Sequence, residues 1–251
     1  MALYVIGDLH LSLSTEKPMD VFGSRWTGYV EKLKNGWLSR VKPEDTIILA
    51  GDISWGMDPQ EAKADFDLIE SLPGQKIILK GNHDYWWQTL AKLNRFVEEN
   101  KYKTIRFLHN NAYEVEDFII CGSRGWYTDE RGGVAVRGAD ATKIVAREVQ
   151  RVAMSLDAGK KLQAEALARG EEKEILAFLH FPPIFKGYIC DEIILELYRK
   201  GVERCYFGHI HGNYEAARVI NYSDIDFYLI SADYLLFEPL KIPSKSQKKE
   251  N

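Results

Sequence analysis

Five short motifs in this chain carry side chains that commonly bind metal ions. They read DLH, GD, GNHD, LH and GHIH, and each lies at the end of an apolar run. Their polar residues are Asp8, His10, Asp52, Asn82, His83, Asp84, His180, His209 and His211. Carboxylates and imidazoles with an amide, and without a thiolate, suit Mn, Fe or Zn rather than a structural cysteine site. These donors exceed what one ion needs.

The histidines of the chain are concentrated in these motifs. Of the six histidines only His109, in RFLHNN, lies outside them, and we expect it to be structural or exposed. An isolated histidine is usually a satisfied core or surface residue. Five that follow apolar runs, several beside Asp or Asn, instead indicate a shared site.

The spacing within DLH and GHIH favours two neighbouring ions. The two donors of each motif are two positions apart, so an ideal strand directs them to the same side, and a loop could do likewise. Two ions about 3.5–4 Å apart can deprotonate a water and bind the oxygens of a phosphoryl group during in-line displacement. The sequence therefore favours phosphoryl chemistry at a two-metal site.

The apolar runs before the motifs have the composition of β-strands. Each is short, rich in β-branched and aromatic residues, and ended by Gly or a polar residue. The expected strands lie in LYVIGD, TIILAGD, KIILKGNHD, TIRFLH, FIICGS, EILAFLH, RCYFGHIH and DFYLIS. Ligand sites in parallel α/β sheets form beyond the carboxyl ends of the strands, so five strand ends are expected to deliver side chains to one place.

Helical periodicity lies between these runs. Residues 26–38 and 62–72 are expected to form helices that link the first three strands, which are then parallel. A further helix is expected from residue 139 to about residue 156, resumed after Gly159. Residues 214–231 have no helical signal and are expected to be antiparallel. The predicted fold class is α/β with mixed sheets.

Composition narrows the class of protein. The 251 residues are 45% hydrophobic, enough for a sizeable core, and we expect one domain over 1–240 with a helical insertion near 139–169. Lys and Arg number 33 against 37 Asp and Glu, a net charge of −4 that disfavours extended nucleic acid as a partner. Residues 241–251 form an expected polar, basic tail.

The three cysteines and the hydropathy bear on location. Cys121, Cys190 and Cys205 form no CxxC pair, and no run of eighteen apolar residues occurs. The first residues lack the pattern of an export signal. We therefore expect a reduced, cytoplasmic protein without a membrane segment.

Taken in order, the series D-x-H, GD, GNHD, H and GHxH resembles that of the calcineurin-like metallophosphoesterase superfamily. The motifs run from Asp8 to His211, and the five in order are highly specific although each alone is weak. The resemblance implies a sandwich of two mixed β-sheets flanked by helices, with two divalent or trivalent metal ions. It implies one ion held by Asp8, His10 and His211, another held by Asn82, His180 and His209, and Asp52 bridging the two.

The resemblance also implies roles for the rest of GNHD. His83 would contact the phosphate and protonate the leaving oxygen, and Asp84 would orient or charge-tune that imidazole. A metal-bound hydroxide would attack phosphorus directly, and an imidazole with a near-neutral pKa is a natural proton donor. The glycines that precede proposed ligands are expected either to permit tight turns or simply to end strands: Gly7, Gly51, Gly81 and Gly208.

Departures from the family pattern bear on the substrate. Protein Ser/Thr phosphatases of this superfamily read GDxxDRG and GNHE, whereas this chain has GDISWG and GNHD. The combination of DLH, GNHD and HFPP is more similar to small bacterial phosphodiesterases and phosphohydrolases. We therefore expect a small phosphorylated substrate, such as a nucleotide, bound as a monoester or a diester.

Candidate substrate contacts lie near the motifs. Arg124 could bind phosphate oxygens, as could Arg131 and Arg137, or all three could be solvated loop residues. Trp126 could wall a pocket or pack in the core. The same alternatives hold for Trp55, Trp86 and Trp87.

Two rival functions remain open at this stage. A metal-dependent nuclease would carry similar motifs, although the acidic net charge disfavours it. A noncatalytic binding scaffold could keep the fold, but it would be expected to lose metal ligands or the histidine of GNH, and this chain retains them. The sequence leaves the oligomeric state open.

Overall fold

The chain contains two compact units, each built around one large mixed sheet. The computed structural model describes residues 1–127 and 139–244. The first unit comprises Met1–Phe107, His209–Tyr214 and Ile230–Asn251, and the second comprises Leu108–Gly208 and Glu215–Leu229. The predicted α/β class with two mixed sheets flanked by helices is confirmed. Among the described residues, no helix has the length and apolarity needed to cross a bilayer.

The sheet of the first unit has the strand order β13-β1-β2-β3-β4. Strands β1 to β4 are parallel and β13 is antiparallel to β1, so the predicted parallel, helix-linked first three strands are confirmed. The strands are β1 (Leu3–Ile6), β2 (Thr46–Ala50), β3 (Gln75–Leu79), β4 (Ile105–Phe107) and β13 (Leu240–Ile242). The helices are η1 (Met19–Phe22), α1 (Tyr29–Arg40), α2 (Lys63–Ser71) and α3 (Leu90–Glu99).

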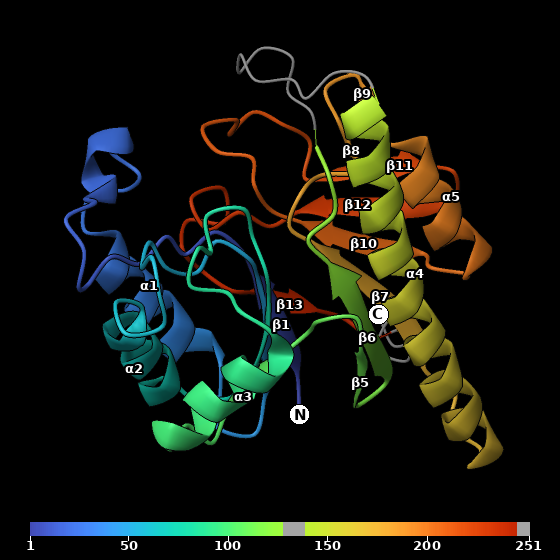
Figure 1. The fold of residues 1–251 in the computed structure, drawn as a ribbon, viewed down its shortest axis with the longest axis horizontal. Helices are drawn as coiled ribbons and strands as arrows, with labels where there is room; N and C mark the ends of the chain where they lie inside the picture. The colour runs from blue at the N-terminus through green and yellow to red at the C-terminus, as the bar shows by residue number, and fades with distance from the viewer. Residues whose placement is uncertain (128–138, 245–251) are drawn as a thin grey trace. The chain divides into compact units, whose positions relative to one another are not determined.

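Burial explains why these runs form central strands. Every residue of β1 and β2 is buried, as expected for parallel strands that are covered on both faces. The helices α1, α2 and α3 lie together beside this sheet (Figure 1). Their buried aromatic side chains, such as Trp37 and Phe66, belong to one core cluster with the strand residues. The same packing leaves the carboxyl ends of β1, β2 and β3 adjacent at one edge.

Lys76 is an exception within this buried sheet. Its side chain is fully buried, and its Nζ donates hydrogen bonds to the Leu72 carbonyl and the Thr104 hydroxyl. Burial lowers the pKa of Lys76 to about 8, against an opposing effect of the Glu70 charge. The ammonium therefore remains charged at neutral pH at a cost in stability.

Replacing Lys76 with Met is expected to raise the free energy of unfolding at pH 7 by about 1 kcal/mol, because it removes a buried charge and conserves volume. The pKa of Lys76 is lower in the folded state than in the unfolded state. Between about pH 8 and pH 10.5 the unfolded chain therefore binds more protons than the folded chain, and the wild type becomes more stable as the pH rises. The advantage of the variant should therefore shrink between pH 7 and pH 9.5 in urea unfolding.

The matched control for this prediction is Lys34→Met, which removes an ammonium paired with Glu31 on the surface of α1. This control should show no comparable pH dependence. An advantage of Lys76→Met that is equal at the two pH values would contradict the assignment of the effect to the buried charge.

The sheet of the second unit has the strand order β11-β12-β10-β7-β6-β5. Its four central strands are parallel and its two edge strands, β5 and β11, are antiparallel to their neighbours. The strands are β5 (Ala112–Val115), β6 (Phe118–Ser123), β7 (Glu174–Leu179), β10 (Arg204–Phe207), β11 (Val219–Tyr222) and β12 (Ile225–Leu229). The remaining elements are α4 (Ala139–Ala168), α5 (Asp191–Arg199) and the two-stranded β8 (Ile184–Phe185) and β9 (Tyr188–Ile189).

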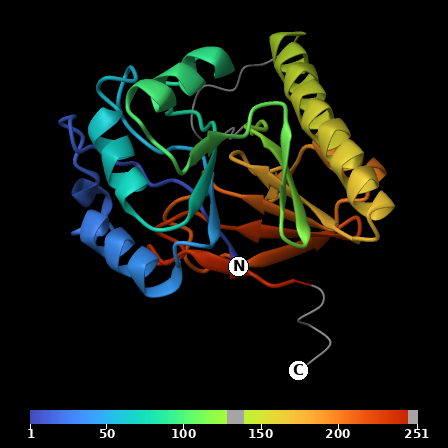
Figure 2. The same cartoon turned by 90° about the horizontal axis from the view of Figure 1, so that it is seen from below.

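The helix expected in two parts around Gly159 is one continuous helix, α4. It packs against β5, β6, β7 and α5, and Figure 2 shows it as the long yellow helix of this unit. A Cβ at Gly159 would lie 2.2 Å from the Cys121 Sγ, so close helix-to-strand packing rather than a helix break explains the glycine.

The cysteines are buried in the core, and the C-terminal residues begin with a strand. All three cysteines are free and buried. Lys241 and Ile242 lie in β13, where Ile242 pairs with Leu3, so the polar tail starts later than residue 241. Residues 245–251 of that tail lie outside the described residues.

Candidate metal centre

The loops that follow β1 and β2 are joined by backbone hydrogen bonds. The Asp8 N–H donates to the Gly51 carbonyl and the His10 N–H donates to the Asp52 carbonyl, both at 2.9 Å. Leu9, between the two ligand-type residues, is fully buried in the core. Asp8 and His10 are in one group, as expected from DLH, but both have a left-handed and not an extended backbone.

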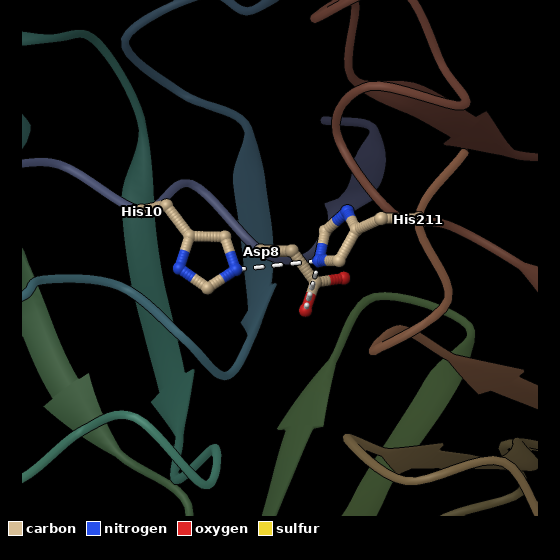
Figure 3. A group of neighbouring side chains, drawn as sticks. All are labelled: Asp8, His10 and His211. Carbon is tan, nitrogen blue, oxygen red and sulfur yellow. Dashed lines mark hydrogen bonds and ion pairs between the residues drawn. The ribbon is translucent and has the colours of Figure 1, made fainter. Parts of the chain in front are cut away.

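Asp8, His10 and His211 form a compact group within the first unit. One ligand atom from each lies within 4.8 Å of the others. The Nε2 atoms of His10 and His211 are 3.3 Å apart, and the His211 Nε2 is 3.8 Å from an Asp8 carboxylate oxygen. Figure 3 shows the three side chains directed toward one another, Asp8 and His10 from the segment that follows β1 and His211 from a segment far along the chain. This is the set that the family resemblance assigned to one ion.

Asp52 lies between this group and His209. Its Oδ2 is 3.7 Å from the His10 Nε2, and one of its carboxylate oxygens lies within 4.8 Å of a ring nitrogen of His209. Its Oδ1 accepts a 2.7 Å hydrogen bond from the His83 N–H. One buried carboxylate thus adjoins side chains that were assigned to two different ions, as a bridging ligand would.

The backbone of four of these residues adopts the left-handed conformation. The φ angles of Asp8, His10, Asp52 and His209 are 59°, 47°, 51° and 70°. Such values are uncommon outside glycine, and strained backbone of this kind is concentrated at functional sites. Of the four glycines expected to supply tight turns, Gly51 alone is among those with positive φ. The tight turns are therefore made mainly by the ligand-type residues themselves.

Position 81 requires glycine because Asp52 leaves no room for a side chain there, and not because of its φ angle. A Cβ at this position would lie 2.1 Å from the Asp52 Oδ1 and 2.2 Å from the Asp52 backbone nitrogen. Both distances are far below van der Waals contact, so any side chain at position 81 displaces Asp52.

Replacing Gly81 with Ala is therefore expected to lower kcat by about 10²-fold, the size of effect that follows a misplacement of about 1 Å. The melting temperature and circular dichroism should be measured on the same sample. Full activity in a folded Gly81→Ala protein would contradict the role of Gly81 in positioning Asp52.

Asp233 is a site residue that the motifs did not indicate. Its buried Oδ1 is 2.8 Å from the His211 Nδ1, and its Oδ2 accepts a hydrogen bond from the Gly212 N–H. A carboxylate on the far nitrogen of a ligand histidine fixes the tautomer and leaves Nε2 to bind the ion. Asp233 lies beyond the last motif, where only its position shortly after the strand DFYLIS could have suggested it.

The site contains several carboxylates that are buried together. Burial raises the pKa of Asp52 to about 6. Burial raises the pKa of Asp8 to about 7, and the nearby Asp52 charge contributes to this rise. Burial opposes the charge of His211, but hydrogen bonding to Asp233 and the Asp8 and Asp52 charges raise its pKa to about 9. This clustered negative charge suits a site for cations.

Asp84 holds loop backbone in place. Its two oxygens accept hydrogen bonds from the N–H groups of Asp52, Ile53 and Gly81 at 2.7–2.9 Å and from the Trp86 indole at 3.0 Å. Burial raises its pKa to about 7. The carboxylate therefore fixes the loops that present Asp52 and the GNHD residues. Its expected role, to orient or charge-tune the imidazole of His83, stays a prediction.

His83 is bordered by two aromatic side chains. Its Nδ1 lies 3.3 Å from the Tyr85 hydroxyl, and its ring centroid lies 4.5 Å from that of Trp55. Burial lowers the pKa of His83. The negative charge of Asp52 opposes this shift, and the positive charges of His211 and Lys17 add to it. Trp55 also stacks on His10, whereas Trp86 and Trp87 are buried in the core, so Trp55 is the member of that set beside the site.

The other predicted contacts belong to the second unit. His180 follows β7 and is fully buried, and its N–H donates to the Arg124 carbonyl. The Arg124 guanidinium is 2.9 Å from the buried carboxylate of Glu148 on α4. Trp126 packs edge-on against Phe181. Substrate contact by Arg124 or Trp126 therefore stays a prediction, and Arg131 and Arg137 lie outside the described residues.

The residues of the first unit fit divalent cations. Two imidazole nitrogens face each other at 3.3 Å next to buried carboxylates. A cation that accepts lone pairs from all of these groups would stabilise the arrangement. The nitrogen and oxygen donors, without thiolate, suit Mn, Fe or Zn. Asn82 lies in the same loop as His83, and its role as a ligand stays a prediction.

Comparisons with known proteins agree with this chemistry. A family profile described as calcineurin-like phosphoesterase matches residues 1–213. No curated protein sequence matches the chain significantly. A protein of unknown function from Aquifex aeolicus has a similar structure, with a TM-score of 0.50, 18% identity, and coverage of 96% of this chain and 95% of its own.

A second similar structure is the phosphopantetheinyl hydrolase PptH from Mycobacterium tuberculosis. It has a TM-score of 0.50 and 15% identity, with coverage of 98% of this chain and 97% of its own. At such identities the two structures indicate a shared fold.

Proposed function

Because the chain belongs to the calcineurin-like phosphoesterase family, we propose that it is a metal-dependent hydrolase of small phosphomonoesters or phosphodiesters. The observation that carries the proposal is the group Asp8, His10 and His211 with Asp52 and His83 beside it. A binding scaffold would have no need for a potential proton donor next to a cation site. The substrate is expected to be a small phosphorylated compound, such as a nucleotide, rather than extended nucleic acid.

Seven side chains would hold two ions. Two bound ions of Mn, Fe or Zn would supply Lewis acidity that polarises phosphoryl oxygens and lowers the pKa of water. The proposed ligands are Asp8, His10 and His211 for one ion, Asn82, His180 and His209 for the other, and Asp52 for both. Asp233 would orient His211, and Asp84 would hold the loops that present Asp52 and Asn82.

His83 would assist the departure of the leaving group. Its Nδ1 lies beside the Tyr85 hydroxyl, so Nε2 is the nitrogen left to face the substrate. Protonated Nε2 can donate its proton to the leaving oxygen as the P–O bond breaks, while water attacks phosphorus from the opposite side. No side chain needs to form a covalent intermediate.

Stereochemistry at phosphorus tests this mechanism. Hydrolysis of an ester made chiral with oxygen isotopes and sulfur should give inversion, because a single in-line attack reverses the configuration. Net retention would require two displacements and a phosphoenzyme, and it would contradict the proposed direct attack.

A further inference from the structure

Lys17 and His83, the proposed proton donor, both contact the indole ring of Trp55. Its ammonium is over the Trp55 indole, 4.6 Å from the ring centroid. The same indole packs against His83, with the ring centroids 4.5 Å apart. Both groups thus lie against the same indole, and the Lys17 charge is close enough to contribute to lowering the pKa of His83.

The segment that carries Lys17 is anchored on both sides. Before it, the Leu13 N–H donates a 2.9 Å hydrogen bond to the buried carboxylate of Asp65. After it, the Met19 side chain is buried and its sulfur lies 3.3 Å from the Trp55 indole nitrogen. The path of this segment is thus fixed on the same tryptophan that lies beside His83.

Lys17 has no carboxylate partner among the side chains that the structure describes. Within residues 1–127 and 142–244, no acidic side chain forms an ion pair with it. By contrast, Lys34 and Lys63 of the same unit pair with Glu31 and Asp67. A cation–π contact leaves the N–H groups of an exposed ammonium able to bind an anion.

We propose that Lys17 and Trp55 form a subsite for a second anionic group, a carboxylate or a further phosphate, carried by the leaving group of the substrate. The inference rests on the proposed role of His83, because the leaving oxygen must then lie beside that imidazole. Trp55 would contact the part of the leaving group between the ester oxygen and the anion. The substrate class is thus a phosphate ester whose leaving group carries a second negative charge, separated from the ester oxygen by about the width of one aromatic ring.

Two aryl esters that differ only in this charge test the subsite. The substrates are 4-carboxyphenyl phosphate and its neutral counterpart, 4-carbamoylphenyl phosphate. The ratio of their kcat/KM values should fall about tenfold in Lys17→Met, as expected for the loss of one charge-assisted contact. The ratio should be retained in Lys17→Arg and in the control Lys34→Met. Comparing proteins on the same pair cancels the intrinsic reactivity of the esters.

A binding measurement separates this inference from the proposed reaction. Calorimetric titration of metal-loaded protein with 4-carboxybenzylphosphonate and 4-carbamoylbenzylphosphonate, which are not hydrolysed, should show the same tenfold change in the affinity ratio. This result would support the subsite even if neither ester were turned over. Equal ratios in wild type and Lys17→Met would overturn it. An equal loss of kcat/KM or of affinity for the charged and the neutral compound of each pair would place Lys17 at the reacting phosphate. This outcome would also overturn the proposed subsite.

Discussion

Replacing Asp52 with Asn is expected to lower kcat by about 10³-fold or more, equivalent to at least about 4 kcal/mol of barrier. The amide conserves the size of the side chain and can still accept the hydrogen bond from the His83 N–H. It removes the negative charge that adjoins both His10 and His209. Loss of activity should therefore reflect the charge rather than the fold.

The measurement is steady-state hydrolysis together with the number of metal ions bound per chain. Asp67→Asn is the matched control, because Asp67 is a half-exposed carboxylate on α2 that pairs with Lys63. This control should keep both activity and metal content. An Asp52→Asn protein within about threefold of wild-type kcat would exclude a bridging role for this carboxylate.

Replacing His83 with Asn is expected to lower kcat by about 10²–10⁴-fold for esters of poor leaving groups, the range typical of a lost general acid. An alkyl leaving group departs as an unstable alkoxide unless it is protonated. A p-nitrophenolate needs no proton, so the loss on p-nitrophenyl phosphate should be much smaller. The dependence of log kcat on leaving-group pKa should steepen accordingly.

The comparison residue for this prediction is His109, the one histidine outside the motifs. His109→Asn should leave the leaving-group dependence unchanged. A uniform loss in His83→Asn across all leaving groups would instead indicate that His83 binds the phosphate without donating a proton.

The order of strands and motifs made much of the site predictable. Strands β1, β2 and β3 are short apolar runs that pair in parallel, so the polar residues after them necessarily meet at one sheet edge. The two-residue spacing in DLH placed Asp8 and His10 in one group. The resemblance to the calcineurin-like family is confirmed by a match over 213 residues.

Features set by tertiary packing were not predictable. Asp233 binds His211 although it lies 22 residues further along the chain, and no local pattern marks it. Asp52 has a left-handed backbone, and its N–H donates to the carboxylate of Asp84, which lies 32 residues further along the chain. Lys17 lies in a polar segment whose path depends on Asp65 and Trp55, so its position near His83 needed the structure.

The fold differed from expectation for similar reasons. Gly159 suggested a helix break, but it permits close contact of α4 with the strand that carries Cys121. The polar residues around Ile242 suggested a frayed tail, but an antiparallel pairing with β1 orders them. In both cases a long-range contact decided the local structure.

Metal titration of hydrolysis tests the proposed function most directly. Chelated protein should be assayed with bis(p-nitrophenyl) phosphate and p-nitrophenyl phosphate while Mn²⁺ is added in known ratios. We expect no turnover without metal and a rate that rises to a plateau near two ions per chain, and the preferred ester would distinguish diesterase from monoesterase activity. Two ions bound per chain without turnover of either ester, or turnover that persists after chelation, would contradict a dinuclear phosphoesterase.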